Sequence, residues 1–414
     1  MIAYNRWELE NGLRVIFYKT HGRTQATVNV LYNVGARDEN ENRTGFAHLF
    51  EHLMFSGSAN VPSYDAIVEN AGGSNNAYTT NDITNYYIKL PTENLETALW
   101  LESDRMMALN ISHNSLAVQK GVVVEEFKQR CYNSGFGLLW HDARKLMYKK
   151  HPYRWPTIGL NFEHIETASL DDVKGFYNKF YNPNNAILCI AADIEVDECK
   201  VMVSKWFEDI KNLAEPNGNI YPMETENVDT EVFRGEDLTP HNSVILNWRL
   251  DSILSKEYLE LSSFAEMFSD GHKSYLIKKL IKESEMFNSA SMFVSGGMDY
   301  SQGLYYGILN EGVSHEEGHA KMIEVLNEAM TVGVLTENDL KTYKNMYLYD
   351  VEKEKLKPSN IAEHLCKYEN YGDIELINKW EGKYLELDLD QIINRAKTTL
   401  ITETMSTIYY SPKK

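Results

Sequence analysis

A segment near the middle of the chain most constrains how this sequence can fold. Residues 213–227 read LAEPNGNIYPMETEN, with two prolines and neither the helical nor the strand spacing of apolar side chains. We interpret this segment as a linker, which predicts a first domain at 1–213, a linker at 214–227 and a second domain at 228–414. Each domain is then long enough to bury a core of its own without disulfides.

Strand-like and helix-like segments follow in the same order in both halves. The first half opens with a hairpin at residues 7–19, turned at Asn11-Gly12, and closes with an apolar strand at 186–194. Strands and helices do not alternate regularly, so we predict an α+β fold of two related domains. Each domain should be a largely antiparallel sheet packed with helices.

A shift of 224 residues makes the repeat concrete. It places Glu126 on Asp350 and His48 on His272. Few residues are identical at this shift, so we expect the second domain to be a degenerate copy of the first.

Charge and cysteine content exclude several classes of function. The 41 Lys and Arg residues against 60 Asp and Glu residues give a net charge of −19, which argues against nucleic acid or an anionic membrane as a partner. No apolar run reaches the length of about 18 residues that a membrane-spanning helix needs. The four cysteines have no paired spacing, and the N-terminus lacks a basic segment followed by an apolar one. We therefore expect a cytoplasmic protein, or a periplasmic one if a signal peptide has been removed.

The segment 45–55, GFAHLFEHLMF, carries the strongest indication of chemistry. On a helix, His48, Glu51 and His52 lie on one face and the apolar residues on the other. Two imidazoles four residues apart can reach one ion, and burying them beside a carboxylate in apolar surroundings is costly unless they share a partner. We predict zinc as that partner, because a catalytic zinc takes three protein ligands and keeps one position open. The competing interpretation is a helix whose histidines form local hydrogen bonds.

The third zinc ligand should come from another element, and residues 115–130 offer it. Gln119 and Glu126 lie on one stripe of the helix expected there, and Glu126 stands among apolar residues. Its neighbour Glu125 lies one position round the helix. The pattern alone does not choose between these two carboxylates.

A second histidine pair, in HEEGH at residues 315–319, formally matches the zinc motif His-Glu-x-x-His. Ser314 and Glu317 have the spacing of a capping box, which places this motif in the exposed first turn of a helix rather than in a buried helix. We therefore expect no metal there and interpret the acidic residues as favourable partners of the helix N-terminus.

The first histidine motif and the distant carboxylate resemble the pitrilysin/insulinase family of zinc metallopeptidases, and the chain resembles its half-length subunits, which are similar to mitochondrial processing peptidase. The family motif is His-x-x-Glu-His, followed about 70–80 residues later by a ligand Glu, and His52 and Glu126 reproduce that spacing. The resemblance implies that His48, His52 and Glu126 bind zinc and that Glu51 is the general base. Family members usually carry another Glu seven residues before the ligand, where this chain has Gln119, a candidate supporting residue.

The resemblance extends to the substrate strand. Residues 72–79, GGSNNAYT, resemble the family's glycine-rich approach to an edge strand, so Asn76, Ala77, Tyr78 and Thr79 are expected to bind an extended peptide. The implied function is that of a zinc metalloendopeptidase that cleaves short or unfolded peptides. The competing class is a non-catalytic structural or interaction subunit of the same fold, in which the zinc residues are typically lost.

The second half departs from the active single-chain members of the family. Those members hold substrate with a Ser-Arg-Leu and a downstream Tyr. Here Ser274-Tyr275-Leu276 stands in place of the Ser-Arg-Leu, the downstream position falls near Phe287-Asn288-Ser289, and no Arg lies in 251–303. The resemblance therefore implies a dimer. The chain is expected to be the zinc-bearing subunit beside a related partner that supplies the Arg and Tyr contacts, or else to form a homodimer.

Overall fold

The structure, a computed structural model, describes residues 1–414 except 217, 226–229, 231 and 414. Part of the predicted linker and the start of the predicted second domain therefore lie outside the described residues. The chain forms two compact units, each assembled from three segments of the sequence. The first unit comprises Met1–Lys128, Trp155–Tyr221 and Val351–Trp380, and the second comprises Gln129–Arg154, Pro222–Asp350 and Glu381–Lys414.

These units do not follow the contiguous division at 1–213 and 228–414. Helix α5 (Leu139–Met147) belongs to the second unit although it precedes the predicted linker, and α12 (Pro358–Asn370) belongs to the first unit although it follows the linker. Each of these helices buries apolar side chains against the sheet of the unit that it joins. The burial of a sheet face therefore decides the unit to which each segment belongs.

The first unit contains a six-stranded sheet in the order β1-β2-β6-β3-β5-β4. Its strands are β1 (Asn5–Glu8), β2 (Arg14–Lys19), β3 (Gln25–Tyr32), β4 (Ser74–Thr79), β5 (Thr84–Pro91) and β6 (Ala186–Ala192). The predicted hairpin is confirmed by the antiparallel pair β1 and β2, whose turn contains Gly12 at a φ of +83°. Only β2 and β6 run parallel, and β4 lies at one edge.

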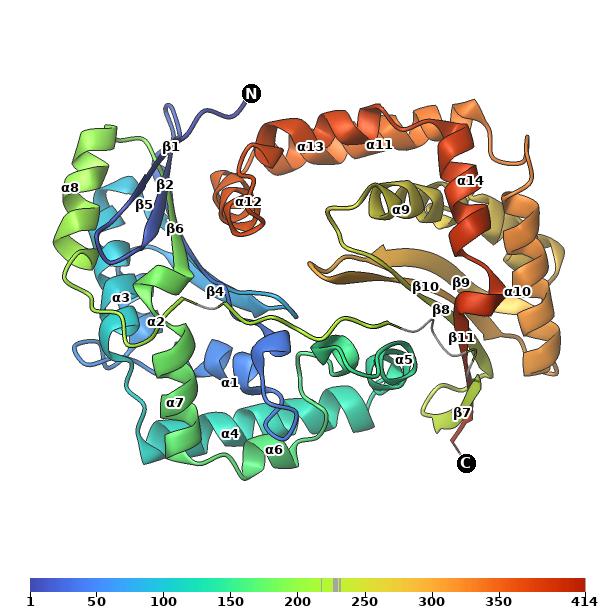
Figure 1. Ribbon diagram of the computed structural model, residues 1–414, viewed down its shortest axis with the longest axis horizontal. Coiled ribbons are helices and arrows are strands. Elements are labelled where there is room, and N and C mark those ends of the chain that lie inside the picture. Colours follow the sequence, from blue (N-terminus) through green and yellow to red (C-terminus); the bar gives the residue numbers. More distant parts are fainter. Residues whose placement is uncertain (217, 226–229, 231, 414) are drawn as a thin grey trace. The chain divides into compact units, whose positions relative to one another are not determined.

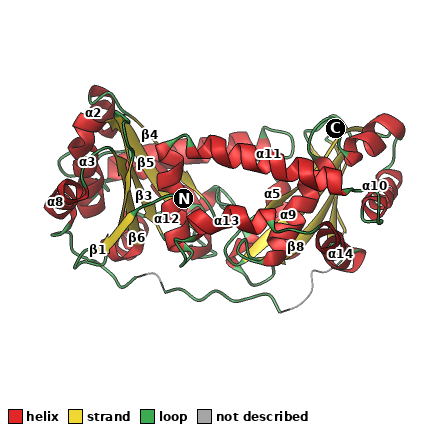
Figure 2. Cartoon of the chain, turned by 90° about the horizontal axis from the view of Figure 1, so that it is seen from above, coloured by secondary structure: helices red, strands yellow, loops and turns green. Residues whose placement is uncertain are grey.

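Helices cover both faces of this first sheet. They are α1 (Phe46–Leu53), α2 (Tyr64–Asn70), α3 (Leu95–Ala108), α4 (His113–Phe127), α6 (Glu163–Glu166), α7 (Leu170–Phe180), α8 (Val196–Phe207) and α12. Apolar residues of α1, α3, α7 and α8 form one core with the sheet, and α12 forms another on the opposite face. Figure 2 shows α3 and α8 on one side of the strands and α12 on the other. Strand β6 is consequently buried along its whole length.

The second unit repeats the same topology. Its five-stranded sheet has the order β7-β11-β8-β10-β9, with strands β7 (Val232–Asp237), β8 (Ser243–Asp251), β9 (Phe287–Ser295), β10 (Tyr300–Leu309) and β11 (Met405–Pro412). Strand β11 is parallel to β7 and antiparallel to β8, just as β6 is parallel to β2 and antiparallel to β3. The predicted α+β fold of two related domains with largely antiparallel sheets is thus confirmed (Figure 1).

The remaining helices complete the second unit. They are α9 (Lys256–Ser269), α10 (His315–Ala329) and α14 (Leu389–Thr399), while α11 (Glu337–Lys355) and α13 (Leu376–Leu385) each cross the division between the units. The short helical turns are η1 (Ala36–Asp38), η2 (Thr92–Asn94), η4 (Pro152–Arg154), η5 (Pro183–Asn185) and η7 (Thr402–Thr404), and the π-helical segments are η3 (Lys128–Tyr132) and η6 (Ile277–Glu283). Within the part of the chain that the structure describes, no helix is long and apolar enough to cross a membrane.

Candidate metal centre

Helix α1 is held at its N-terminus by a buried carboxylate. The two Glu39 carboxylate oxygens accept hydrogen bonds from the backbone N–H groups of Gly45 and Ala47, at 2.9 and 2.8 Å. Burial raises the pKa of Glu39 well above its usual range, and the N–H donors act against that shift. Gly45 adopts a φ of +88°, where a side chain would be strained and would approach the Ile158 carbonyl oxygen to 3.0 Å. These contacts fix where the helix begins.

The two faces of α1 differ as the sequence predicts. Phe46, Leu49, Phe50 and Leu53 are buried in the core of the first unit. The other face carries His48, Glu51 and His52, and its two imidazole rings lie 5.0 Å apart between centroids. The apolar face therefore anchors the helix and directs the polar side chains toward α4, against which α1 packs (Figure 1).

Helix α4 brings Glu126 to these histidines. Its Oε2 atom lies 3.6 Å from Nε2 of His48 and 3.3 Å from Nε2 of His52. One ligand atom from each of the three residues lies within 4.8 Å of the others. His48 is buried, whereas His52 and Glu126 are partly exposed, so a bound ion would remain open to a further ligand from solvent.

Glu125 is turned away from this group. Its side chain is 74% exposed, and its Oε1 atom accepts a hydrogen bond from Nζ of Lys128 at 3.0 Å. Of the two carboxylates that the sequence left open, the structure thus places Glu126, and not Glu125, beside the histidines.

The donor set has the chemistry that zinc prefers. Two imidazole nitrogens and one carboxylate oxygen are typical of catalytic zinc sites, where three protein ligands leave a fourth position for water or substrate. Elsewhere among the described residues, no other set of three His, Cys, Asp or Glu side chains converges in this way. The residues present therefore fit a zinc ion held by His48, His52 and Glu126.

Glu51 is oriented by the edge strand. Its Oε2 atom accepts a hydrogen bond of 2.7 Å from the Thr79 hydroxyl, and Thr79 is the last residue of β4. Thr79 was expected only as part of the substrate strand. Its contact with Glu51 joins residues far apart in the sequence, so no local pattern could reveal it.

Strand β4 alternates between two environments. The Tyr78 hydroxyl donates to Oε1 of Glu363 on α12 at 3.0 Å, and the Lys367 ammonium lies 5.3 Å from the Tyr78 ring centroid. Ala77 and Thr79 face the other side, where Ala77 packs against the main core. The strand pairs only with β5, so its second edge has no strand partner among the described residues.

Gln119 contacts a neighbour of the metal group rather than the group itself. Its Nε2 atom donates to the Ser56 hydroxyl at 3.0 Å, just beyond the end of α1. The contact links α4 to α1, which is consistent with a supporting residue.

The second histidine motif has other partners. The capping box of Ser314 and Glu317 is present, with Ser314 accepting from the Glu317 N–H at 3.2 Å. The His315 Nε2 atom contacts the Tyr410 carbonyl oxygen at 2.8 Å, and the His319 Nδ1 atom contacts the Tyr409 hydroxyl at 2.5 Å. The two histidines are half-buried rather than exposed as expected, because they pack against β11.

The variants His315→Ala and His319→Ala should leave the zinc content of the chain unchanged. Each histidine makes hydrogen-bonding and ring contacts in the second unit, and neither belongs to the metal group, so their loss should cost only about 0.5–3 kcal/mol of stability. Elemental analysis of the purified variants provides the measurement. A loss of zinc in either variant would mean that this motif binds metal.

Two family models match the chain. The model described as "Insulinase (Peptidase family M16)" matches residues 14–143, and the model described as "Peptidase M16 inactive domain" matches residues 167–347. The first match contains all four residues of the candidate metal centre. The second covers most of the strands and helices of the second unit.

Individual relatives agree with these matches. The chain is 28% identical over 410 residues to "Zinc protease PqqE" of Helicobacter pylori, covering 98% of this chain and 92% of the relative. It is 31% identical over 209 residues to "Mitochondrial-processing peptidase subunit beta" of Caenorhabditis elegans, covering 49% of this chain and 44% of that one. A crystal structure of a protease from Helicobacter pylori superposes with a TM-score of 0.93 at 26% identity and covers both chains completely. The chain therefore belongs to the peptidase M16 family.

Proposed function

We propose that this chain is a zinc-dependent metalloendopeptidase that cleaves short or unfolded peptides. The observation that carries the proposal is the convergence of His48, His52 and Glu126, with Glu51 beside them on the same helix. Zinc, when bound there, supplies a Lewis acid that polarises a peptide carbonyl and makes water more acidic. The names of the relatives, which are zinc proteases and a processing peptidase, support the same activity.

Glu51 serves as the general base in this proposal. Its carboxylate takes a proton from the attacking water and later gives the proton to the amine that leaves. The Thr79 hydroxyl holds one carboxylate oxygen, which leaves the other free to face the water. Thr79 is thus a positioning residue for the base.

The free edge of β4 binds the peptide in this proposal. A substrate in extended conformation adds to the edge as a further strand, with backbone hydrogen bonds to residues 76–79. Backbone groups are common to all sequences, so cleavage should depend weakly on side chains. Most backbone groups of a folded protein are already hydrogen-bonded internally, so this mode of binding favours short or unfolded chains.

Digestion of an unstructured peptide mixture tests the proposal. The zinc-loaded protein should cleave peptides, a chelator should stop cleavage, and added zinc should restore it. Cleavage that persists after all zinc has been removed would contradict the proposal. A preparation that binds no zinc under non-chelating conditions would instead favour a non-catalytic subunit of the same fold.

The substitution Thr79→Val should lower kcat about tenfold and leave KM unchanged. Valine keeps the shape of threonine and the backbone edge of β4, but it cannot donate the hydrogen bond to Glu51. Thr79→Ser keeps the hydroxyl and should restore most of the rate. Equal kinetics for the Val variant and the wild type would remove Thr79 from the positioning of the base.

We further propose that a related second chain completes the substrate site. Tyr275 stands where the family has its Arg, and its hydroxyl donates to Oε2 of Glu328 at 2.9 Å. The expected position of the downstream Tyr is occupied by Phe287, Asn288 and Ser289, so this chain supplies neither contact. The chain alone should therefore be poorly active, because contacts that orient a substrate supply several kcal/mol of barrier lowering.

Co-expression with a related chain that lacks the zinc residues and carries the Arg and Tyr should raise turnover strongly. Sedimentation and peptide turnover provide the measurements, and a homodimer that cleaves peptides briskly without any other polypeptide would contradict this expectation.

A further inference from the structure

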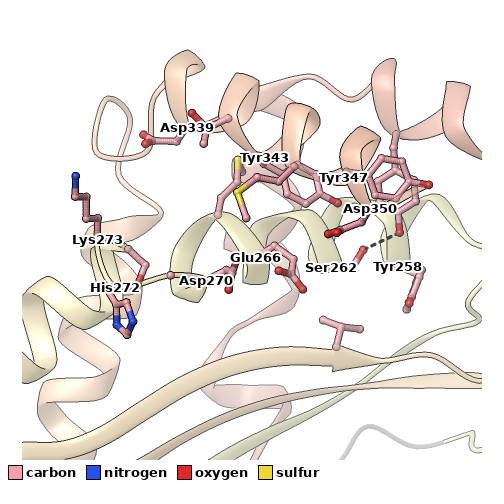
Figure 3. Close-up of a pocket in the computed structure, with 17 residues that line it drawn as sticks. Tyr258, Ser262, Glu266, Asp270, His272, Lys273, Asp339, Tyr343, Tyr347 and Asp350 are labelled. Carbon is pink, nitrogen blue, oxygen red and sulfur yellow. Dashed lines mark hydrogen bonds between the residues drawn. The ribbon is translucent and has the colours of Figure 1, made fainter. Parts of the chain in front are cut away.

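The second unit contains a pocket of about 520 Å³ that has no part in the proposed peptidase centre (Figure 3). A volume of this size lies in the range of small-ligand sites. The pocket lies between α9 and α11, with contributions from β9 and α13. We call it the acidic pocket, and its lining includes Tyr258, Glu266, Asp270, Tyr343, Tyr347, Asp350 and Tyr384.

The acidic pocket occupies the place in the second unit that the metal centre has in the first. Helix α1 follows β3, precedes the edge strand β4 and packs on α4; α9 follows β8, precedes the edge strand β9 and lines the pocket with α11. The shift of 224 residues correctly relates α4 to α11 but not α1 to α9, because His272 lies after α9 has ended at Ser269. The second unit therefore has a pocket at the position where the first unit has the metal group.

Four carboxylates line this pocket, those of Glu266, Asp270, Asp339 and Asp350, and none of them has a cationic partner among the described residues. Glu266 and Asp270 are four residues apart at the C-terminal end of α9, a helix whose last turn has no basic residue. Like charges at this spacing repel, and the helix dipole makes this end unfavourable for anions. Asp350 approaches them from α11, and partial burial together with Asp270 and Asp350 raises the pKa of Glu266. Asp339 lies near the start of α11, where it accepts hydrogen bonds from the backbone N–H and the hydroxyl of Thr336.

The arrangement of these carboxylates does not suit a single metal ion. Among the described residues, only the group in the first unit has three ligand atoms close enough to share one ion. The acidic side chains are instead spread along the pocket, as Figure 3 shows for Glu266, Asp270 and Asp350. Carboxylates spread along a pocket suit a ligand with several separated positive groups better than a single metal ion.

Tyrosine rings form another part of the wall. The rings of Tyr347 and Tyr384 stack with centroids 4.2 Å apart, and Tyr343 lies 6.4 Å from each. Aromatic faces attract ammonium groups, and they can also pack against an aliphatic chain that joins two ammonium groups. The one lysine in the lining, Lys273, is drawn at the end of the pocket remote from Tyr347 and Asp350 (Figure 3).

We propose that the acidic pocket binds an organic cation with primary ammonium groups on a flexible aliphatic chain. A free polyamine and a lysine side chain of a peptide share this chemistry. The site lies wholly in the second unit and requires no zinc. This proposal can therefore fail while the proposed peptidase activity is correct, and the reverse.

Isothermal titration tests the proposal with two probes, spermidine and an unstructured peptide containing several lysines. The protein is the full zinc-loaded chain carrying Glu51→Gln, so that the peptide is not cleaved. The double variant Glu266→Gln/Asp350→Asn should weaken binding about tenfold, because it removes the contributions of two exposed ion pairs to the binding free energy. The matched control is Glu324→Gln/Glu352→Gln, which removes the same charge from two exposed carboxylates paired with Lys321 and Lys355.

Binding of spermidine alone would identify a free polyamine as the ligand, and binding of the peptide alone would identify a lysine-bearing segment. Either result supports the proposal if the pocket variant weakens binding and the control does not. Equal weakening by both variants would show only general attraction to an acidic protein and would overturn the proposal. Absence of binding of both probes at low salt would overturn it as well. Thermal melting of each variant confirms that the fold is intact.

Discussion

The variant Glu51→Gln should retain zinc and lose peptide cleavage. The amide side chain cannot accept the proton of the attacking water, whereas His48, His52 and Glu126 keep their donor atoms. Loss of a general base costs about 10²–10⁴-fold in rate, and a residue that also acts as the acid in the second step costs more. The measurement is the zinc content of the variant beside its turnover, made in the assembly that gives the highest wild-type rate.

The interpretation of this experiment depends on the metal content. If the variant has lost zinc as well as activity, the loss of the metal alone explains the loss of cleavage, and the role of Glu51 as the base is not tested. A variant with full zinc and wild-type turnover would contradict the role of Glu51 as the base. Thr79→Val provides the matched comparison, because it removes the hydrogen bond that orients the same carboxylate and leaves the chemistry of that carboxylate intact.

The variant Glu126→Gln should bind zinc at least about 100-fold more weakly than the wild type. Residues that only support metal ligands already contribute 10–100-fold to affinity, so the loss of a ligand charge should cost no less. The neighbouring variant Glu125→Gln is the control, because this side chain is exposed and pairs with Lys128. Titration against a competing chelator measures both affinities. A Glu125 variant that loses zinc, beside a Glu126 variant that keeps it, would contradict the geometry of α4.

Local patterns in the sequence predicted much of the fold. The Asn11-Gly12 turn and the buried strand β6 follow from short stretches of sequence, and the repeated order of elements follows from comparing the two halves. The sequence pattern does not predict that α5 joins the second unit and α12 the first. An amphipathic helix shows that it needs an apolar surface, but it does not show which of two similar sheets supplies that surface.

The sequence likewise predicted part of the candidate metal centre. Both histidines and Glu51 follow from the period of one helix, and Glu126 was one of two carboxylates left open by the pattern. The burial of Glu39 at the start of α1 and the bond from Thr79 to Glu51 could not be predicted. Both contacts depend on where loops and strand ends lie in space, and a single sequence holds no periodic signal for such positions.

A zinc titration followed by both metal content and peptide cleavage tests the central claim most directly. The chain is stripped of metal, titrated with zinc in the presence of the proposed second chain, and assayed at each step. We expect cleavage to rise in proportion to the zinc bound and to reach its maximum at one zinc per chain, with no such rise for Glu126→Gln. Full cleavage by the metal-free chain, or saturation with zinc without any cleavage, would contradict the claim that His48, His52 and Glu126 form a catalytic zinc site.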